Sequence, residues 1–167
     1  MFYKRKYISG VLGAPCTQEL KKKARQEWET NNPHDYIVLG FTSDEKKRHD
    51  RFILTERQNV LPVLIDENIS KQDCFKIIQE AGIKLPEIYS MGFPNANCVG
   101  CVKSSSPSYW SLVRKAFPSN FEKMAKASRE IGCKLIKVKG NRIFLDELPD
   151  IEYKKPSKFN FECGLVS

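Results

Sequence analysis

Two cysteines, Cys98 and Cys101, are the residues of this chain whose type and spacing most clearly allow chemistry. They are separated by Val99 and Gly100 within residues 91–103, a stretch whose glycine, proline and asparagine residues predict a loop. A Cys-x-x-Cys pair on a loop places two thiolates side by side, with backbone N–H groups free to face whatever the thiolates hold. The pattern allows a metal or iron–sulfur site, a redox-active pair, or two unrelated thiols.

Two further cysteines stand where a reactive or ligating thiol is expected. Cys16 follows a turn that contains glycine and proline and directly precedes a predicted helix. The positive end of a helix favours a thiolate or an anionic ligand. Cys163 lies close to the C-terminus, where packing seldom requires a cysteine. It is therefore predicted to be a reactive thiol or a ligand.

The charge of the chain favours polyanionic partners. Its 28 Lys and Arg residues outnumber 20 Asp and Glu residues, which gives a net charge of +8 and a pI near 9.2. Long-range attraction to nucleotides, RNA or DNA follows from such a charge, although a solubilising surface explains it equally well. The basic residues occur in short clusters and not in one long tail.

Length and composition predict a single domain over residues 1–167, with a tail from Leu148 onwards. No apolar run is long enough to span a bilayer, so no membrane partner is expected. Six cysteines without an export signal predict reduced thiols and a cytoplasmic location.

The elements that must position the thiols are predicted to form an α/β fold. Residues 36–41 form an almost continuous apolar run, which is typical of a strand buried on both faces, and residues 60–65 form a second run. Gly40 ends the first run and a polar helix follows it, which is the junction where open α/β sheets bind ligands. Arg48 and Arg51 on that helix could face phosphate or sulfate, or could belong to a solvated charged face.

Helices are predicted over residues 17–28, 70–81, 107–116 and 119–131. Thr17 is the expected cap of the first helix, with Leu20 and Trp28 on its buried face. The second helix has a capping box, Ser70 to Asp73, and a predicted core stripe of Cys74, Ile77, Ile78 and Ala81. Residues 132–145 predict a β-hairpin that turns at Gly140 and Asn141, with Cys133 in a structural role.

Three features in combination resemble a known family. Cys16 is followed at a distance by Cys98-x-x-Cys101, residues 162–165 read Glu-Cys-Gly-Leu, and Gly40 precedes an acidic pair and Arg48. The combination resembles the sulfonucleotide reductases, the phosphoadenylyl-sulfate and adenylyl-sulfate reductase family of the adenine nucleotide alpha-hydrolase-like superfamily. The resemblance is greatest to the reductase-like proteins of bacteriophages and prophages, which share segments like residues 97–103.

The resemblance implies a partial Rossmann-like sheet with helices, followed by the C-terminal β-hairpin. It implies a four-iron cluster held by the cysteines of the motif, with zinc as the alternative metal and Cys163 either as the fourth ligand or as the catalytic nucleophile. It also implies that an adenine nucleotide or sulfonucleotide is bound by a second set of residues. The implied metal ligands are Cys16, Cys98, Cys101 and Cys163, and the implied nucleotide-binding residues are Gly40, Glu45, Arg48 and Lys103.

The chain also departs from the family pattern. Thr17 replaces the second cysteine of a pair, Thr42 stands where an arginine is usual, and Val166 stands where a histidine is usual. The family's pyrophosphate loop has no counterpart before the matched region. We therefore expect the chain to be part of an enzyme, with a second chain or segment that supplies this loop. The alternative is a non-catalytic, basic, metal-stapled module, that is, a domain held together by zinc or a cluster, which binds nucleic acid or protein.

Overall fold

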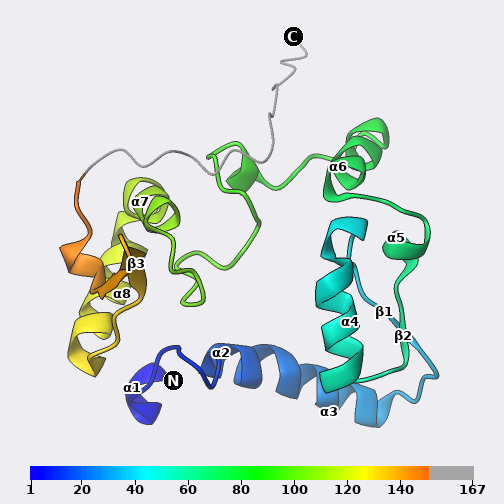
Figure 1. The fold of residues 1–167 in the computed structure, drawn as a ribbon, viewed down its shortest axis with the longest axis horizontal. Helices are drawn as coiled ribbons and strands as arrows, with labels where there is room; N and C mark the ends of the chain where they lie inside the picture. The colour runs from blue at the N-terminus through cyan, green and yellow to red at the C-terminus, as the bar shows by residue number, and fades with distance from the viewer. Residues whose placement is uncertain (151–167) are drawn as a thin grey trace. The chain divides into compact units, whose positions relative to one another are not determined.

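The computed structural model describes residues 1–150, and these divide between two compact units, where the length predicts one domain. Unit 1 contains Met1–Arg25 and the residues from Pro86 onwards, and unit 2 contains Gln26–Leu85. In Figure 1, α7, α8 and β3 belong to unit 1, and α4, β1 and β2 belong to unit 2. The fold is α/β in the broad sense that helices accompany small sheets.

Unit 1 is mainly helical. Its elements are α1 (Phe2–Arg5), α2 (Pro15–Thr17), the π-helix η1 (Gln18–Lys22), the first residues of α3 (Lys23–Asn31), η3 (Glu87–Tyr89), α7 (Pro107–Ala116), α8 (Pro118–Ile131), β3 (Ile136–Val138), β4 (Asn141–Ile143) and η4 (Leu145–Glu147). Helix α7 packs against α8 and β3, and α8 packs against η4. The completely buried side chains of Trp110, Val113 and Ile136 lie at the centre of this core. The predicted helices over 107–116 and 119–131 are confirmed, the second beginning one residue earlier.

The predicted hairpin is confirmed, with its turn one residue earlier than expected. Strands β3 and β4 are antiparallel, and Val138 pairs with Asn141. The two turn residues are therefore Lys139 and Gly140, which have φ values of 46° and 88°. Positive φ at both central positions is the conformation of a type I′ turn, whose twist matches that of the flanking strands.

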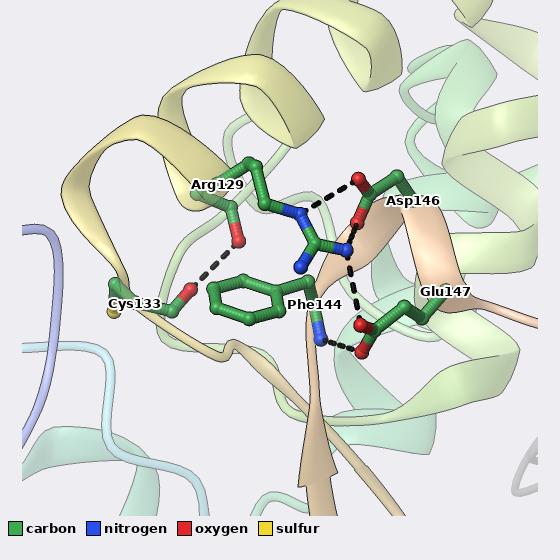
Figure 2. Close-up of polar contacts among 6 residues, drawn as sticks. Arg129, Cys133, Phe144, Asp146 and Glu147 are labelled. Carbon is green, nitrogen blue, oxygen red and sulfur yellow. Dashed lines mark hydrogen bonds and ion pairs between the residues drawn. The ribbon is translucent and has the colours of Figure 1, made fainter.

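Arg129, in the last turn of α8, binds side chains of η4 (Figure 2). Its guanidinium donates hydrogen bonds of 2.9 and 2.8 Å to Asp146 and one of 3.0 Å to Glu147. It also lies over the Phe144 ring, 4.0 Å from the ring centroid. The hydrogen bonds from Arg129 lower the pKa of Asp146, because they favour the carboxylate.

Leu148, where the tail is predicted to begin, is folded into unit 1, and residues 151–167 of the predicted tail lie outside the described residues. Leu148 is only 4% exposed, and its carbonyl oxygen accepts a 2.8 Å hydrogen bond from Arg114. This position is therefore part of the unit 1 core.

Unit 2 contains a small parallel sheet and three α-helices besides the end of α3. Its elements are β1 (Ile37–Val38), η2 (Ser43–Glu45), α4 (Lys46–Thr55), β2 (Val60–Leu61), α5 (Val63–Asp66) and α6 (Lys71–Glu80). Ile37 pairs with Val60 in parallel register. The second apolar run stops being a strand at Pro62, which has no N–H to continue the ladder and becomes the N-cap of α5. Within residues 1–150 the only parallel sheet has these two strands.

The capping box of α6 is confirmed, but its core stripe is not. Ser70 Oγ accepts a 3.2 Å hydrogen bond from Asp73 N, and Asp73 Oδ2 accepts one of 3.0 Å from Ser70 N. Phe75 is the buried residue of the helix, and Ile77 is 49% exposed. Cys74 is half-buried, and burial raises the pKa of its thiol.

The first predicted helix begins earlier than expected and buries a different set of residues. Helical structure runs continuously from Pro15 to Asn31, and Ala14, not Thr17, is the N-cap. Leu20 and Trp28 are 68% and 58% exposed. After Thr17, the half-buried positions of this helix are instead charged residues at helical spacing, namely Glu19, Lys22, Arg25 and Glu29. In the part of the chain that the structure describes, no helix is long and apolar enough to cross a bilayer.

Candidate thiol site

The Cys98–Cys101 loop is a tight reversal of the chain ahead of α7. Cys98 is exposed, and Cys101 is half-buried against the core of unit 1. Between them, Gly100 is buried and has φ of +72°. A Cβ atom at this position would lie 3.4 Å from Met124 Cγ. Glycine therefore suits the position because of its backbone conformation, since a Cβ at that distance would make only an ordinary contact.

A single side chain, Tyr109, joins the two cysteine residues through their backbones. Its hydroxyl donates a 2.9 Å hydrogen bond to the carbonyl oxygen of Cys98 and accepts a 2.7 Å hydrogen bond from the N–H of Cys101. The ring is 6% exposed and contacts Phe93 and Trp110 edge-on, at centroid distances of 5.7 and 5.4 Å. Burial raises the pKa of the Tyr109 phenol, so its hydroxyl keeps the proton that it donates.

The segment that leads from the loop into α7 is held by three more hydrogen bonds. Trp110 Nε1 donates to Ser104 O at 2.7 Å, and Ser104 N donates to Cys101 O at 3.0 Å. Lys137 N, on β3, donates to Ser105 O at 2.9 Å. The loop is thus fixed both to the helix that follows it and to the hairpin.

Cys16 and Cys133 are the other cysteines of unit 1 that the structure describes. Cys16 lies at a helix N-terminus as predicted, but as the second residue of the helical segment that begins at Pro15 and not before it, and it packs against the same core cluster as Cys101. Cys133 also packs against that cluster, and its Sγ donates to Ser9 O at 3.5 Å, which agrees with a structural role.

Among the described residues, the structure does not bring the predicted ligands Cys16, Cys98 and Cys101 into one group. Within residues 1–150, no three or more His, Cys, Asp or Glu side chains are placed to hold a metal ion. Cys98 and Cys101 therefore offer a pair of donors that Cys16 does not complete in this arrangement. Cys163 lies outside the described residues, so the site of four cysteines stays a prediction.

The predicted nucleotide-binding residues belong to different units. Lys103 is exposed in unit 1, whereas Gly40, Glu45 and Arg48 belong to unit 2. Arg48 Nη1 donates a 2.5 Å hydrogen bond to Glu45, and its guanidinium lies 5.4 Å from the centroid of the Phe41 ring. Its side chain is 72% exposed, which is the environment of a solvated charged face. The strand–turn–helix junction around Gly40 is present, and a Cβ added at Gly40 would have nothing but its own chain neighbours within 4 Å.

Sequence reasoning missed Tyr109 as a site residue. A signal existed, because a tyrosine in the first turn of an apolar helix is expected to be buried and to find a partner for its hydroxyl. The Cys-x-x-Cys loop ends only eight residues before it and carries backbone groups in need of partners.

No protein-family model, no curated protein and no solved structure matches this chain.

Proposed function

We propose that the chain is a sulfonucleotide-reductase-like protein in which Cys98 and Cys101 hold one side of a four-iron cluster. The observation that supports this proposal is the Tyr109-bridged loop, which presents two thiols from one rigid turn. Cysteine thiolates are the donors that hold both iron–sulfur clusters and structural zinc, so the donor chemistry fits either centre. Cys16 would supply a third thiolate, and Cys163 would be either the fourth ligand or, in the reaction below, the free nucleophile; zinc is the alternative occupant. When bound, a four-iron cluster supplies a redox-active centre.

The proposed reaction is thiol attack on the sulfur of an activated sulfate. The Cys163 thiolate would form a bond to that sulfur, and the bond from sulfur to the bridging oxygen would break, with its electron pair leaving on the nucleotide phosphate. Gly40, Glu45, Arg48 and Lys103 would contact the adenine nucleotide or sulfonucleotide. The parallel pair β1–β2 would be one part of a Rossmann-like sheet. A second chain or segment would supply the pyrophosphate loop, and the reduced thiols would suit the cytoplasm.

Anaerobic purification followed by iron, acid-labile sulfide and zinc analysis tests the proposal. We expect about four iron and about four sulfide per chain after reconstitution, as in a four-iron cluster. Cys98→Ser and Cys101→Ser should each lose most of the iron. Cys74→Ser is the matched control, because Cys74 belongs to unit 2 and should leave the iron content unchanged. Zinc binding without sulfide would replace the cluster with a zinc site, and the absence of any thiol-dependent metal would overturn the proposal.

A basic, metal-stapled binding module is the second candidate, and the net charge of +8 favours it. Such a module would bind a single-stranded or duplex oligonucleotide with an affinity that falls steeply as salt increases, because binding releases counterions. Fluorescence anisotropy at several salt concentrations distinguishes it from the reductase-like protein. Strong oligonucleotide binding together with no binding of a sulfonucleotide would favour the module.

A further inference from the structure

We propose that Tyr109 is a positioning residue for the thiol pair, and that its hydroxyl sets how Cys98 and Cys101 present their sulfur atoms to a thiophilic metal centre. The inference deepens the proposed function and rests on it to the extent that the pair binds a metal. It concerns a residue that contacts neither metal nor substrate and acts through the backbone of the two cysteines.

The geometry of the turn supports this role. In a four-residue turn, the N–H of the fourth residue commonly donates directly to the carbonyl oxygen of the first. Here the Tyr109 oxygen connects the same two groups, at 2.7 Å from Cys101 N and 2.9 Å from Cys98 O. A phenol has one hydrogen to donate and a lone pair to accept with, and the turn uses both. Both ends of the turn therefore form hydrogen bonds with one atom, the Tyr109 hydroxyl oxygen.

The Tyr109 hydroxyl oxygen is held in a fixed position. Tyr109 lies in the first turn of α7, which begins at Pro107 and is capped by the Ser106 side chain. The buried ring is held edge-on by Phe93 and by the completely buried Trp110. A tyrosine has only two rotatable side-chain angles, and packing fixes both here. The hydroxyl can move only if the core of unit 1 moves with it.

One of the two bonds orients an exposed residue. Cys98 is exposed, yet its carbonyl oxygen accepts a hydrogen bond from a side chain of the unit 1 core. The bond from Tyr109 therefore ties an exposed residue to a fixed position in that core. A metal between two thiolates requires sulfur–metal distances of about 2.3 Å, which a freely moving loop does not maintain.

Cadmium titration of the full-length chain, followed by thiolate-to-metal absorbance, tests the inference. Groups that orient metal ligands typically change metal affinity by about 10- to 100-fold when removed, and we expect a loss of this size for Tyr109→Phe. The matched control is Tyr89→Phe. Tyr89 also uses its hydroxyl on this loop, accepting a 3.3 Å hydrogen bond from Ala96 N, but it does not join the two cysteines. We expect the control to stay within about twofold of the parent, since it leaves the turn intact.

Thiol reactivity provides a readout that a purely structural role would not change. Quantitative alkylation followed by peptide mass spectrometry gives separate rates for Cys98, Cys101 and Cys133. In Tyr109→Phe, the ratio of the Cys98 alkylation rate to the Cys101 alkylation rate should change by about threefold or more. The substitution removes an accepted hydrogen bond at the Cys98 carbonyl and a donated one at the Cys101 N–H, and these two losses are unequal. The Cys133 rate should stay constant if the core remains folded.

The outcomes separate this inference from the proposed function. Cadmium affinity in Tyr109→Phe that equals that of the parent, with an unchanged alkylation ratio, would overturn the inference. Failure to assemble an iron–sulfur cluster, with cadmium binding that still depends on Tyr109, would overturn the cluster and support the inference. Should Tyr109→Phe not fold, Tyr109→4-aminophenylalanine keeps a donor but is a poor acceptor, and cadmium affinity within about twofold of the parent would then be the overturning result.

Discussion

Substituting Gly100→Ala should destabilise unit 1 by about 1–2 kcal/mol, because an L-residue in the left-handed region carries a cost of that size. The new Cβ would add little, since Met124 Cγ lies 3.4 Å away, at the close limit of ordinary contact, on a flexible side chain. Gly132→Ala is the matched control. Gly132 has φ of +75° at the C-cap of α8, and nothing lies within 4 Å of its would-be Cβ. It carries the same backbone cost without any contact.

Urea denaturation of the parent and both variants measures these costs, and alkylation of the cysteines reports on the loop. Both variants should lose similar stability, but only Gly100→Ala should alter the relative reactivity of Cys98 and Cys101, since residue 100 lies between them. A Gly100→Ala variant as stable as the parent, alongside a destabilised Gly132→Ala, would show that residue 100 does not adopt positive φ. The argument for a tight, fixed turn would then fail.

Two further predictions concern ion pairs and caps. Arg129 lowers the pKa of Asp146 in the folded protein. The pair's contribution to the free energy of unfolding is therefore present above the ordinary aspartate pKa and is lost as the pH falls through the folded pKa. In unfolding curves measured at a series of pH values, Arg129→Met should lose less stability than the parent as the solution is acidified. In urea denaturation, Ser70→Ala should lower the stability of unit 2 by about 1 kcal/mol, whereas Ser70→Asn should keep most of the parent's stability. If Ser70→Ala is as stable as the parent, the capping box does not stabilise the unit.

Elements whose signals are local were predictable from the sequence. Ser70 with Asp73 and Ser106 with Pro107 mark the starts of α6 and α7, because capping depends on residues a few positions apart. Gly140 predicts the hairpin for the same reason, although the register places its turn one residue earlier. These features need no knowledge of the rest of the chain.

Elements that depend on tertiary context were not predictable to the same extent. Within residues 1–150, the apolar run over residues 36–41 is paired only at Ile37 and Val38, because its partner run is interrupted at Pro62. The helix that begins at Pro15 half-buries charged positions such as Glu19 and Glu29 and leaves Leu20 exposed, which its apolar pattern does not reveal. The division into two units likewise follows from contacts and not from a composition change.

The thiol site combines both kinds of information. The spacing of Cys98 and Cys101 is local and identifies the pair, but the geometry of the pair comes from Tyr109, Trp110 and Lys137 on the following helix and hairpin. The main-chain hydrogen bond from Lys137 to the segment after the loop means that the hairpin and the site share one scaffold. Side chains that hold a loop through its backbone leave no spacing signature of their own, because they satisfy groups that every residue carries. Residues of this kind are found by asking where the loop's N–H and C=O groups obtain their partners, and in this chain that question leads to Tyr109.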